Sequence, residues 1–324
     1  MIVKSRNVTT LISITFFLLI GFIFFTLSTT FAQGKKRIYI LKSMDNKFYN
    51  DAIAGFKSNC PGEYKEFNIN NNYAIAKTYA DQINAEHPDL VLAVGARALI
   101  AAKNYISSSI PIVFTVVLNP ERLNIKAPNI TGVRLEIPVE VQLKTIKAIV
   151  PNIKKIGVLY NPRNSENIIK EAKRVAAKLG LQLIAGRVET EDDTLDALQL
   201  FAGGIDAYWL IPDPTVVTRK SFVEILKFTN EKKIPFFVFS KALVKSGAFI
   251  ALTVGDYVSL GAQACEIAQR IFSGIPPSQI PYEYPRGLEI AVNVQVARLL
   301  NLTQIATNAI MFASQNGYKI TPLQ

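Results

Sequence analysis

Histidine and cysteine are scarce in this chain of 324 residues, and their scarcity limits the chemistry available to it. Because the one histidine is His87, beside Pro88 in a predicted connection, neither a Ser/His/Asp triad nor a histidine-based metal site is available. The two cysteines, Cys60 and Cys265, lie far apart in the sequence, which does not fix their distance in space. An oxidising compartment would permit a bridge between them, but we expect both to be unpaired, with Cys265 buried on a helix. We also expect no cofactor and no metal.

Long hydrophobic runs are absent outside the N-terminal region. In the rest of the chain, no uncharged run approaches the roughly 20 residues that a membrane-spanning helix needs. At the N-terminus, Lys4 and Arg6 precede an apolar run over 11–27, and residues 30–32 suit a cleavage site. This layout predicts a signal peptide over 1–32 and a periplasmic or secreted protein, with an uncleaved membrane anchor as the alternative. No cysteine follows the run, so a lipid-anchored terminus is not indicated.

Concentrated blocks of basic residues are also missing, although the chain is basic. Without its first 32 residues it carries 34 basic and 25 acidic residues, a net charge of +9. The basic residues are spread along predicted amphipathic helices, where charged side chains normally form a solvated face. Since no Lys/Arg block with interleaved aromatic residues occurs, we expect no nucleic-acid partner.

The sequence does contain a repeated pattern of apolar segments. Three segments of the first half recur in the same order, 117 to 124 residues later, in the second half. The pairs are 36–41 with 154–159, 89–93 with 206–211, and 110–114 with 234–238. A near-constant offset indicates two copies of one α/β unit, and two similar lobes can enclose a cleft.

Short apolar runs alternate with segments of helical spacing in both halves. The predicted strands are 38–41, 64–69, 89–94, 111–116, 155–159, 181–186, 206–211, 235–239, 249–253 and 289–293. The predicted helices are 48–58, 72–86, 96–105, 139–150, 164–179, 192–202, 215–232 and 256–273. The alternation predicts an α/β fold of two Rossmann-like lobes with parallel sheets, divided near 130–138. The segment after 253 can return to either lobe, so the domains can be discontinuous.

The repeat also predicts which loops face the cleft, because ligands of open parallel sheets bind beyond the carboxyl ends of the strands. These loops are 95–97, 115–120, 160–167, 212–215 and 239–241. Together with the start of the helix at 256, they supply the candidate ligand-binding residues Ala96, Arg97, Thr115, Tyr160, Ser165, Asp213, Thr215, Ser240 and Asp256. No GxGxxG motif follows the first strand of either half and no GxxxxGK[ST] motif occurs, so no nucleotide fingerprint is present.

Asp213 is the sharpest local signal among these candidates. Pro212 and Pro214 fix the backbone around its carboxylate, which suits a hydrogen bond from an ammonium group, although Asp before Pro is also a standard helix start. Arg97 can clamp a carboxylate or point into solvent. Tyr160 can stack against a ligand or pack half-buried, and for Asp256 the capping of its own helix is the favoured role. A basic group opposite an acidic one suits a zwitterionic ligand.

Six segments between about residues 37 and 301 carry a resemblance to a known family. They are Val94–Ala98, Pro111–Thr115, Asn129–Val133, Ile156–Pro162, Ile211–Thr215 and Asp256–Gly261. In order and spacing they resemble the ABC transporter substrate-binding protein family that includes tryptophan/tyrosine-type binding proteins. Members often have Gly-Thr where this chain has Gly95-Ala96, and Thr-Asp-Asn near Pro212–Pro214. Asp213 is retained, which is compatible with an amine-bearing ligand.

The resemblance implies a type I periplasmic-binding-protein fold, with two lobes that are joined by three crossover segments and close on a ligand by a hinge. It implies a first lobe of 37–134 plus about 254–280 and a second lobe of 135–253 plus about 286–310.

The function that the resemblance implies is that of an exported, non-catalytic receptor, which delivers a small, amino-acid-like ligand to an ABC permease and its ATPase. Contact with the membrane is expected through the transporter or an uncleaved leader. One alternative is a ligand-sensing module for a chemoreceptor or a sensor kinase. A remote alternative is an α/β isomerase or racemase with Cys60 and Cys265 as its acid and base, but neither cysteine lies on a predicted cleft loop.

Overall fold

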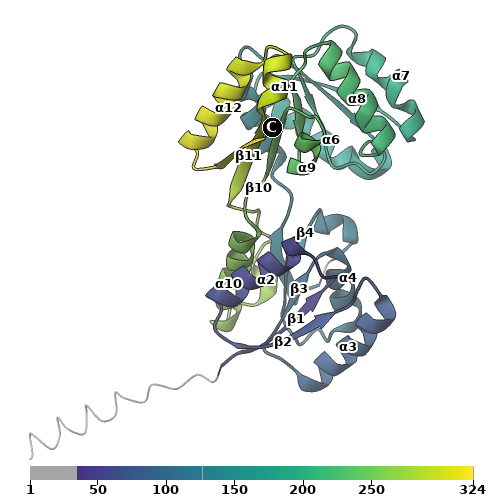
Figure 1. Cartoon of the computed structure of the whole chain (residues 1–324). Coiled ribbons are helices and arrows are strands. Elements are labelled where there is room, and N and C mark those ends of the chain that lie inside the picture. Colours follow the sequence, from purple (N-terminus) through teal and green to yellow (C-terminus); the bar gives the residue numbers. More distant parts are fainter. Residues whose placement is uncertain (1–34, 126, 324) are drawn as a thin grey trace, which may run out of the picture. The chain divides into compact units, whose positions relative to one another are not determined.

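The computed structural model describes residues 35–125 and 127–323, whose course is shown in Figure 1. The predicted signal peptide lies outside these described residues. The chain forms two sheets of five and seven strands that alternate with helices, so the predicted α/β class is confirmed. Within the described ranges, no helix is long and apolar enough to cross a membrane.

The first sheet has five parallel strands in the order β2-β1-β3-β4-β5. They are β1 (Arg37–Lys42), β2 (Glu63–Asn68), β3 (Leu90–Val94), β4 (Ile112–Val117) and β5 (Ile130–Arg134), connected in part by α2 (Lys47–Asn59), α3 (Tyr73–Glu86) and α4 (Ala96–Tyr105). Because side chains alternate along a strand, Ile38 and Ile40 of β1 pack with α2, whereas Tyr39 and Leu41 pack with α3 and α4. Helices therefore cover both faces, which is why the inner strands are apolar throughout.

The second sheet has seven strands in the order β12-β11-β10-β9-β8-β6-β7. Its neighbouring strands are parallel except for the antiparallel pair β10 and β11. The strands are β6 (Lys155–Tyr160), β7 (Gln182–Arg187), β8 (Ala207–Trp209), β9 (Phe236–Val238), β10 (Ile250–Val254), β11 (Leu288–Asn293) and β12 (Lys319–Leu323). The associated helices are α5 (Val139–Ile149), α6 (Pro162–Lys178), α7 (Thr194–Leu198), α8 (Arg219–Glu231), α9 (Lys241–Lys245), α11 (Val294–Leu299) and α12 (Thr303–Gln315).

Helix α10 (Tyr257–Phe272) follows a strand of the second sheet but packs against α2, which covers the first sheet (Figure 1). The two helices cross at glycines. A Cβ atom on Gly55 would overlap with the carbonyl oxygen of Val258, and a Cβ atom on Gly261 would overlap with that of Ala52. Glycine is therefore needed at both positions for the two backbones to approach this closely.

The structure corrects two of the predicted helices. Helix α8 begins at Arg219, with Thr218 as its N-cap, rather than at 215, because a turn in which Asp213 accepts from Val216 and Val217 precedes it. Asp213 is therefore not the N-cap of that helix. The helix expected over 192–202 is divided into short helical segments, of which α7 is one.

The C-terminal region continues beyond the strand that was expected to be the last. Helices α11 and α12 and strand β12 follow β11, and β12 forms the edge of the second sheet. A buried ion pair lies next to this edge. The Glu289 side chain is fully buried and accepts from Lys241 Nζ at 2.9 and 3.1 Å and from the Thr321 hydroxyl of β12.

A second carboxylate with several partners lies at the end of α3. Glu86 accepts from Lys65 Nζ at 2.7 Å, from the Tyr39 hydroxyl and from Gln82 Nε2 at 2.8 Å. The hydrogen bond from Lys65, followed by those from Tyr39 and Gln82, lowers the pKa of Glu86 to about 2. The carboxylate therefore links α3 to β1 and β2.

Candidate functional site

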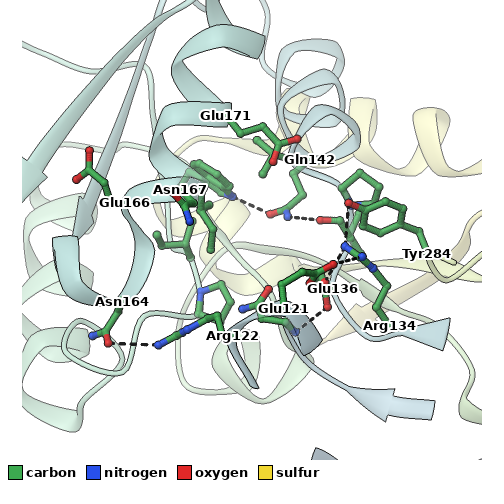
Figure 2. Close-up of a pocket in the computed structure, with 18 of the residues that line it drawn as sticks. Glu121, Arg122, Arg134, Glu136, Gln142, Asn164, Glu166, Asn167, Glu171 and Tyr284 are labelled. Carbon is green, nitrogen blue, oxygen red and sulfur yellow. Dashed lines mark hydrogen bonds and ion pairs between the residues drawn. The ribbon is translucent and has the colours of Figure 1, made fainter. Parts of the chain in front are cut away.

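A cavity of about 610 Å³ is the candidate ligand site, and Figure 2 shows the side chains around it. This volume lies within the roughly 300–1,000 Å³ typical of small-molecule sites. Its walls come from the short helix η1 (Pro120–Leu123), the connection between β5 and α5, the first turn of α5, the N-terminal part of α6, the end of β8, and Tyr284. Three of the predicted cleft loops contribute to it. The lining residues from these loops are Asn119, Pro162, Arg163, Asn164, Glu166, Asn167 and Pro212.

The apolar part of the cavity centres on Trp209, at the end of β8. Its indole Nε1 donates to Gln142 Oε1 at 2.9 Å, and Gln142 Nε2 in turn donates to the carbonyl oxygen of Ile137 at 2.7 Å. Trp209 is 2% exposed, and Ile168 and Pro212 line the cavity near it. Because the indole N–H already has a protein partner, Trp209 offers the cavity an apolar ring surface.

Charged side chains of both signs surround this apolar floor (Figure 2). The acidic ones are Glu121, Glu136, Glu166 and Glu171, and the basic ones are Arg122, Arg134 and Arg163. A cavity with an apolar floor and both charges at its rim can hold a small molecule that has an apolar part and two opposite charges.

Arg134 is the most constrained of the three cations. Its guanidinium lies over the Tyr284 ring, 4.6 Å from the centroid, and donates to the Tyr284 hydroxyl at 3.2 Å. It also forms ion pairs with Glu121 and, at 3.3 Å, with Glu136. Burial raises the pKa of Glu136, while hydrogen bonding from the Asn119 N–H and the charge of Arg134 act in the opposite direction. Arg134 is therefore already neutralised by the protein's own carboxylates.

Arg122 and Glu171 differ from Arg134 in their partners. The Arg122 guanidinium donates to Asn164 Oδ1 at 3.3 Å, and no carboxylate pairs with it among the described residues. Glu171 is exposed on α6, and no cation pairs with it in the same part of the chain. Asn164, Asn167, and Glu171 are spaced by three and four residues, which places them on one face of α6. The two unpaired charges can therefore interact with a ligand.

Asp213 organises the start of α6 rather than lining the cavity. Its carboxylate is fully buried and accepts four hydrogen bonds. Oδ2 accepts from Asn161 N at 2.9 Å and Ser165 Oγ at 2.7 Å, and Oδ1 accepts from Asn164 Nδ2 at 3.1 Å and Thr215 N at 3.0 Å. Because Asn164 also contacts Arg122, Asp213 fixes a residue that does line the cavity.

The local sequence explains how α6 begins at this network. Asn161 is the N-cap, and its side chain accepts from Arg163 N at 2.9 Å, while Pro162 occupies the first helical position, where no N–H is needed. The side-chain amides of Asn161 and Asn164 both donate to Thr215 Oγ1 at 3.1 Å. The predicted residues Ser165, Asp213 and Thr215 therefore meet in one cluster.

None of the nine predicted residues, all within the described ranges, lines this cavity. Tyr160 is 2% exposed, accepts from Arg187 Nε and donates to Glu166 Oε2, both at 3.2 Å. Ser240 is the N-cap of α9, and Asp256 is the N-cap of α10, the role favoured for it from the sequence.

The predicted residues of the first half lie elsewhere. Arg97 donates to the carbonyl oxygen of Asn71 at 2.8 Å, and Ala96 packs against the cluster between the first sheet and α4. Thr115 is fully buried, and among the described residues its hydroxyl has no hydrogen-bond partner. The next residue, Val116, has φ of 56° where β4 shifts register, a conformation that a β-branched residue rarely adopts.

The sequence analysis missed the residues that shape the cavity most directly: Trp209, Gln142, Arg134, Glu136 and Tyr284. One available signal was that Trp209, the one tryptophan, ends a strand of the repeat, where ligand contacts are expected. The described part of the chain contains no group of three or more His, Cys, Asp or Glu residues arranged to hold a metal ion.

Comparisons with known proteins agree with this architecture. Residues 53–314 match the family model "ABC transporter substrate binding protein". The chain is 25% identical over 280 residues to a tyrosine-binding protein of Clostridioides difficile (strain R20291), covering 84% of this chain and 78% of that protein.

Two solved structures are similar in fold. One is the ligand-free, open structure of a substrate binding protein with adhesive properties from Clostridium difficile, with a TM-score of 0.69, 23% identity, and coverage of 82% of this chain and 95% of that one. The other is an ABC domain in complex with L-Trp from Streptococcus pneumonia, with a TM-score of 0.56, 21% identity, and coverage of 83% and 95%. The fold is therefore periplasmic-binding-protein-like, as expected.

Proposed function

The chain belongs to the ABC transporter substrate-binding protein family, and we propose that it is an exported receptor that captures an amino acid with an aromatic side chain in the cavity beside Trp209. The family is one of binding proteins and not of enzymes, which confirms the expectation of a non-catalytic protein. The observation that carries the proposal is the composition of the cavity, in which an apolar floor is bordered by Arg122 and Glu171, neither of which has an oppositely charged partner among the described residues.

The apolar floor suits an aromatic side chain. Trp209 and Tyr284 line the cavity with their rings, and Pro212 adds a rigid apolar surface. Aromatic rings that meet edge-to-face or in offset stacks gain about 0.5–1.5 kcal/mol beyond the burial of their area. Tyrosine as the ligand of the C. difficile relative supports the same class of ligand.

The rim suits the two charges that every free amino acid carries. Arg122 can donate two parallel hydrogen bonds to an α-carboxylate, and Glu171 can accept from an α-ammonium. Asp213 would contribute indirectly, by holding Asn164 against Arg122. This assignment keeps the zwitterionic ligand expected from the sequence but places its charges on different residues.

Calorimetry on protein stripped of bound ligand tests the proposal. L-tyrosine, L-tryptophan and L-phenylalanine should bind, whereas tyramine, which lacks the carboxylate, and 3-(4-hydroxyphenyl)propionate, which lacks the ammonium, should bind more weakly. A hydrogen bond to a charged group contributes about 1.5–3 kcal/mol, so each analogue should lose roughly 10- to 150-fold in affinity. If mass spectrometry of the co-purifying ligand identified a sugar or another uncharged molecule, the proposal would be wrong.

Two arginine variants distinguish binding from general electrostatics. Arg122→Gln should lower the affinity for L-tyrosine by about 10-fold or more, because it removes the charged donor that binds the carboxylate of the ligand. Arg163→Gln is the matched control: Arg163 lies at the same rim, but its side chain is 86% exposed and pairs with Glu189 at 3.8 Å. Equal losses in both variants would mean that the rim attracts the ligand by its overall charge alone.

Export and delivery to a permease and its ATPase are further parts of the proposal. The basic residues and apolar run of the first 32 residues support export. Mass spectrometry of the mature N-terminus would detect cleavage after Ala32, whereas an intact leader would indicate a membrane anchor. Uptake of labelled L-tyrosine into vesicles that contain the cognate permease and ATPase should depend on added receptor, and uptake independent of the receptor would contradict the transport role.

A further inference from the structure

The two cysteines of the chain, 205 residues apart, lie next to each other in the fold. Cys60 directly follows α2, and Cys265 lies in the middle of α10. The sulfur of Cys60 is 3.9 Å from the carbonyl oxygen of Cys265, and both residues belong to the same apolar cluster beside the first sheet. Each residue is 1% exposed, and both thiols are free in this structure.

The crossing of α2 and α10 explains why the two residues are so close. The helices approach at Gly55 and Gly261, where no side chain separates the backbones. Cys60 follows the first glycine by five residues and Cys265 follows the second by four, so each cysteine lies about one helical turn from the point of closest approach. A disulfide needs Cα atoms about 4.4–6.8 Å apart, a separation that helices in backbone contact can provide.

The two thiols also influence each other chemically. The hydrogen bond between them is the largest effect on both groups: it raises the pKa of the Cys60 thiol and lowers the pKa of the Cys265 thiol. The Tyr64 hydroxyl donates to the carbonyl oxygen of Cys60. Cys265 is therefore the better nucleophile of the pair, because the thiolate is the form that attacks a disulfide.

We propose that Cys60 and Cys265 are oxidised to an intramolecular disulfide that fastens α10 to α2. The oxidant is the disulfide of a thiol oxidoreductase or a small disulfide such as oxidised glutathione. Cys265 as its thiolate attacks that disulfide, forms a mixed disulfide and expels one thiolate. Cys60 then attacks the Cys265 sulfur and expels the second thiolate. The protein loses two electrons and two protons, and the oxidant is reduced to two thiols.

The site also fixes when this exchange can take place. Since both sulfurs are buried, the oxidant must reach them before α10 docks on α2, or while the two helices are transiently apart. Once formed, the bond holds α10 on the first sheet even though the preceding strand, β10, belongs to the second. The pairing is independent of the proposed ligand, so a failure of either proposal leaves the other intact.

Alkylation and mass spectrometry of the purified full chain test the pairing. The reduced protein is unfolded, refolded in a mixture of oxidised and reduced glutathione, quenched with acid, and alkylated in denaturant without reductant. We expect no alkylation of the wild type and a mass lower by two hydrogen atoms than that of the reduced protein. A non-reducing proteolytic digest should contain one linked pair of peptides, with Cys60 in one and Cys265 in the other.

The single variants Cys60→Ser and Cys265→Ser are the matched controls. Each should keep one thiol that is alkylated after the same treatment, because it has no partner within the chain. Cys60→Ala and Cys265→Ala replace them if a buried serine prevents folding. Two alkylated thiols in the oxidised wild type would overturn the proposal, as would a disulfide found between two chains instead of within one.

Discussion

Replacing Asp213 by Asn tests whether its carboxylate organises the start of α6. The substitution keeps the shape of the side chain but turns one acceptor oxygen into an NH2 group. Four donors point at this carboxylate, two at each oxygen: Asn161 N and Ser165 Oγ at Oδ2, Asn164 Nδ2 and Thr215 N at Oδ1. Whichever way the amide turns, two of these donors lose their acceptor and face another donor.

The size of the effect follows from burial. Asp213 is fully buried, so water cannot replace the lost acceptor. Leaving a buried donor unsatisfied costs about 1–3 kcal/mol, so two such donors predict a loss of roughly 2–6 kcal/mol in the free energy of unfolding. Ligand affinity should fall as well, because Asn164 loses its anchor next to Arg122.

Urea unfolding and calorimetry of the Asp213→Asn protein measure both effects. Asp206→Asn is the matched control: Asp206 accepts from the N–H groups of Lys154 and Lys155 at 2.7 and 2.8 Å, but it is exposed, so water can satisfy those donors. A stability loss in Asp213→Asn no larger than that of the control would refute its organising role. Weaker binding at unchanged stability would instead favour direct contact between Asp213 and the ligand.

Three other substitutions test the packing and the ion pairs. Gly261→Ala should destabilise the protein by about 3 kcal/mol or more in urea unfolding, since the added methyl group would overlap with the backbone of α2. Gly203→Ala is the control: its methyl group would meet open space, so stability should change by less than about 0.5 kcal/mol. Lys241→Met should lower the free energy of unfolding by about 2 kcal/mol. This is less than the loss of about 3–5 kcal/mol typical of a broken buried ion pair, because the Lys241 side chain is 40% exposed. An unchanged free energy of unfolding would show that Glu289 does not depend on its cation. Glu86→Gln should destabilise the protein at pH 7, and progressively less as the pH falls from about 4.5 towards 2. The pKa of Glu86 is lowered to about 2 in the folded protein, so the stabilising contribution of its carboxylate is lost over that range. A difference in unfolding free energy between variant and wild type that stayed constant with pH would contradict this.

The sequence was most informative about the fold where strands are buried on both faces. Such strands, for example Leu90–Val94, appear as apolar runs bounded by turns, and their repetition indicated both sheets. The edge strand β12 could not be found in this way, because Lys319–Leu323 is half-exposed and contains Pro322, which strands tolerate at a sheet edge. Edge strands lack the apolar pattern that identifies inner ones.

The candidate site was less accessible to sequence analysis than the fold. The loops at 160–167 and 212–215 were selected correctly as contributors to a cavity, because the ends of parallel strands share one edge of a sheet. The neighbours of Trp209 depend instead on how α5 packs beside β8, which brings Gln142 to the indole from 67 residues away. Likewise, nothing in the local sequence distinguishes an Asp that faces a ligand from Asp213, which faces four donors of its own chain.

The return of α10 to the first sheet sets an order of events during synthesis. Strand β5 ends at Arg134, but the apolar cluster beneath α2 needs side chains of α10 as far as Ala268, 134 residues further along the chain. At about 5–20 residues per second, a ribosome takes roughly 7 to 27 s to cover that distance. During this interval α2 alone covers this face of the first sheet. The N-terminal half of the protein therefore cannot finish folding ahead of the C-terminal half, and a nascent chain that stalls within this interval exposes an apolar surface to chaperones and proteases.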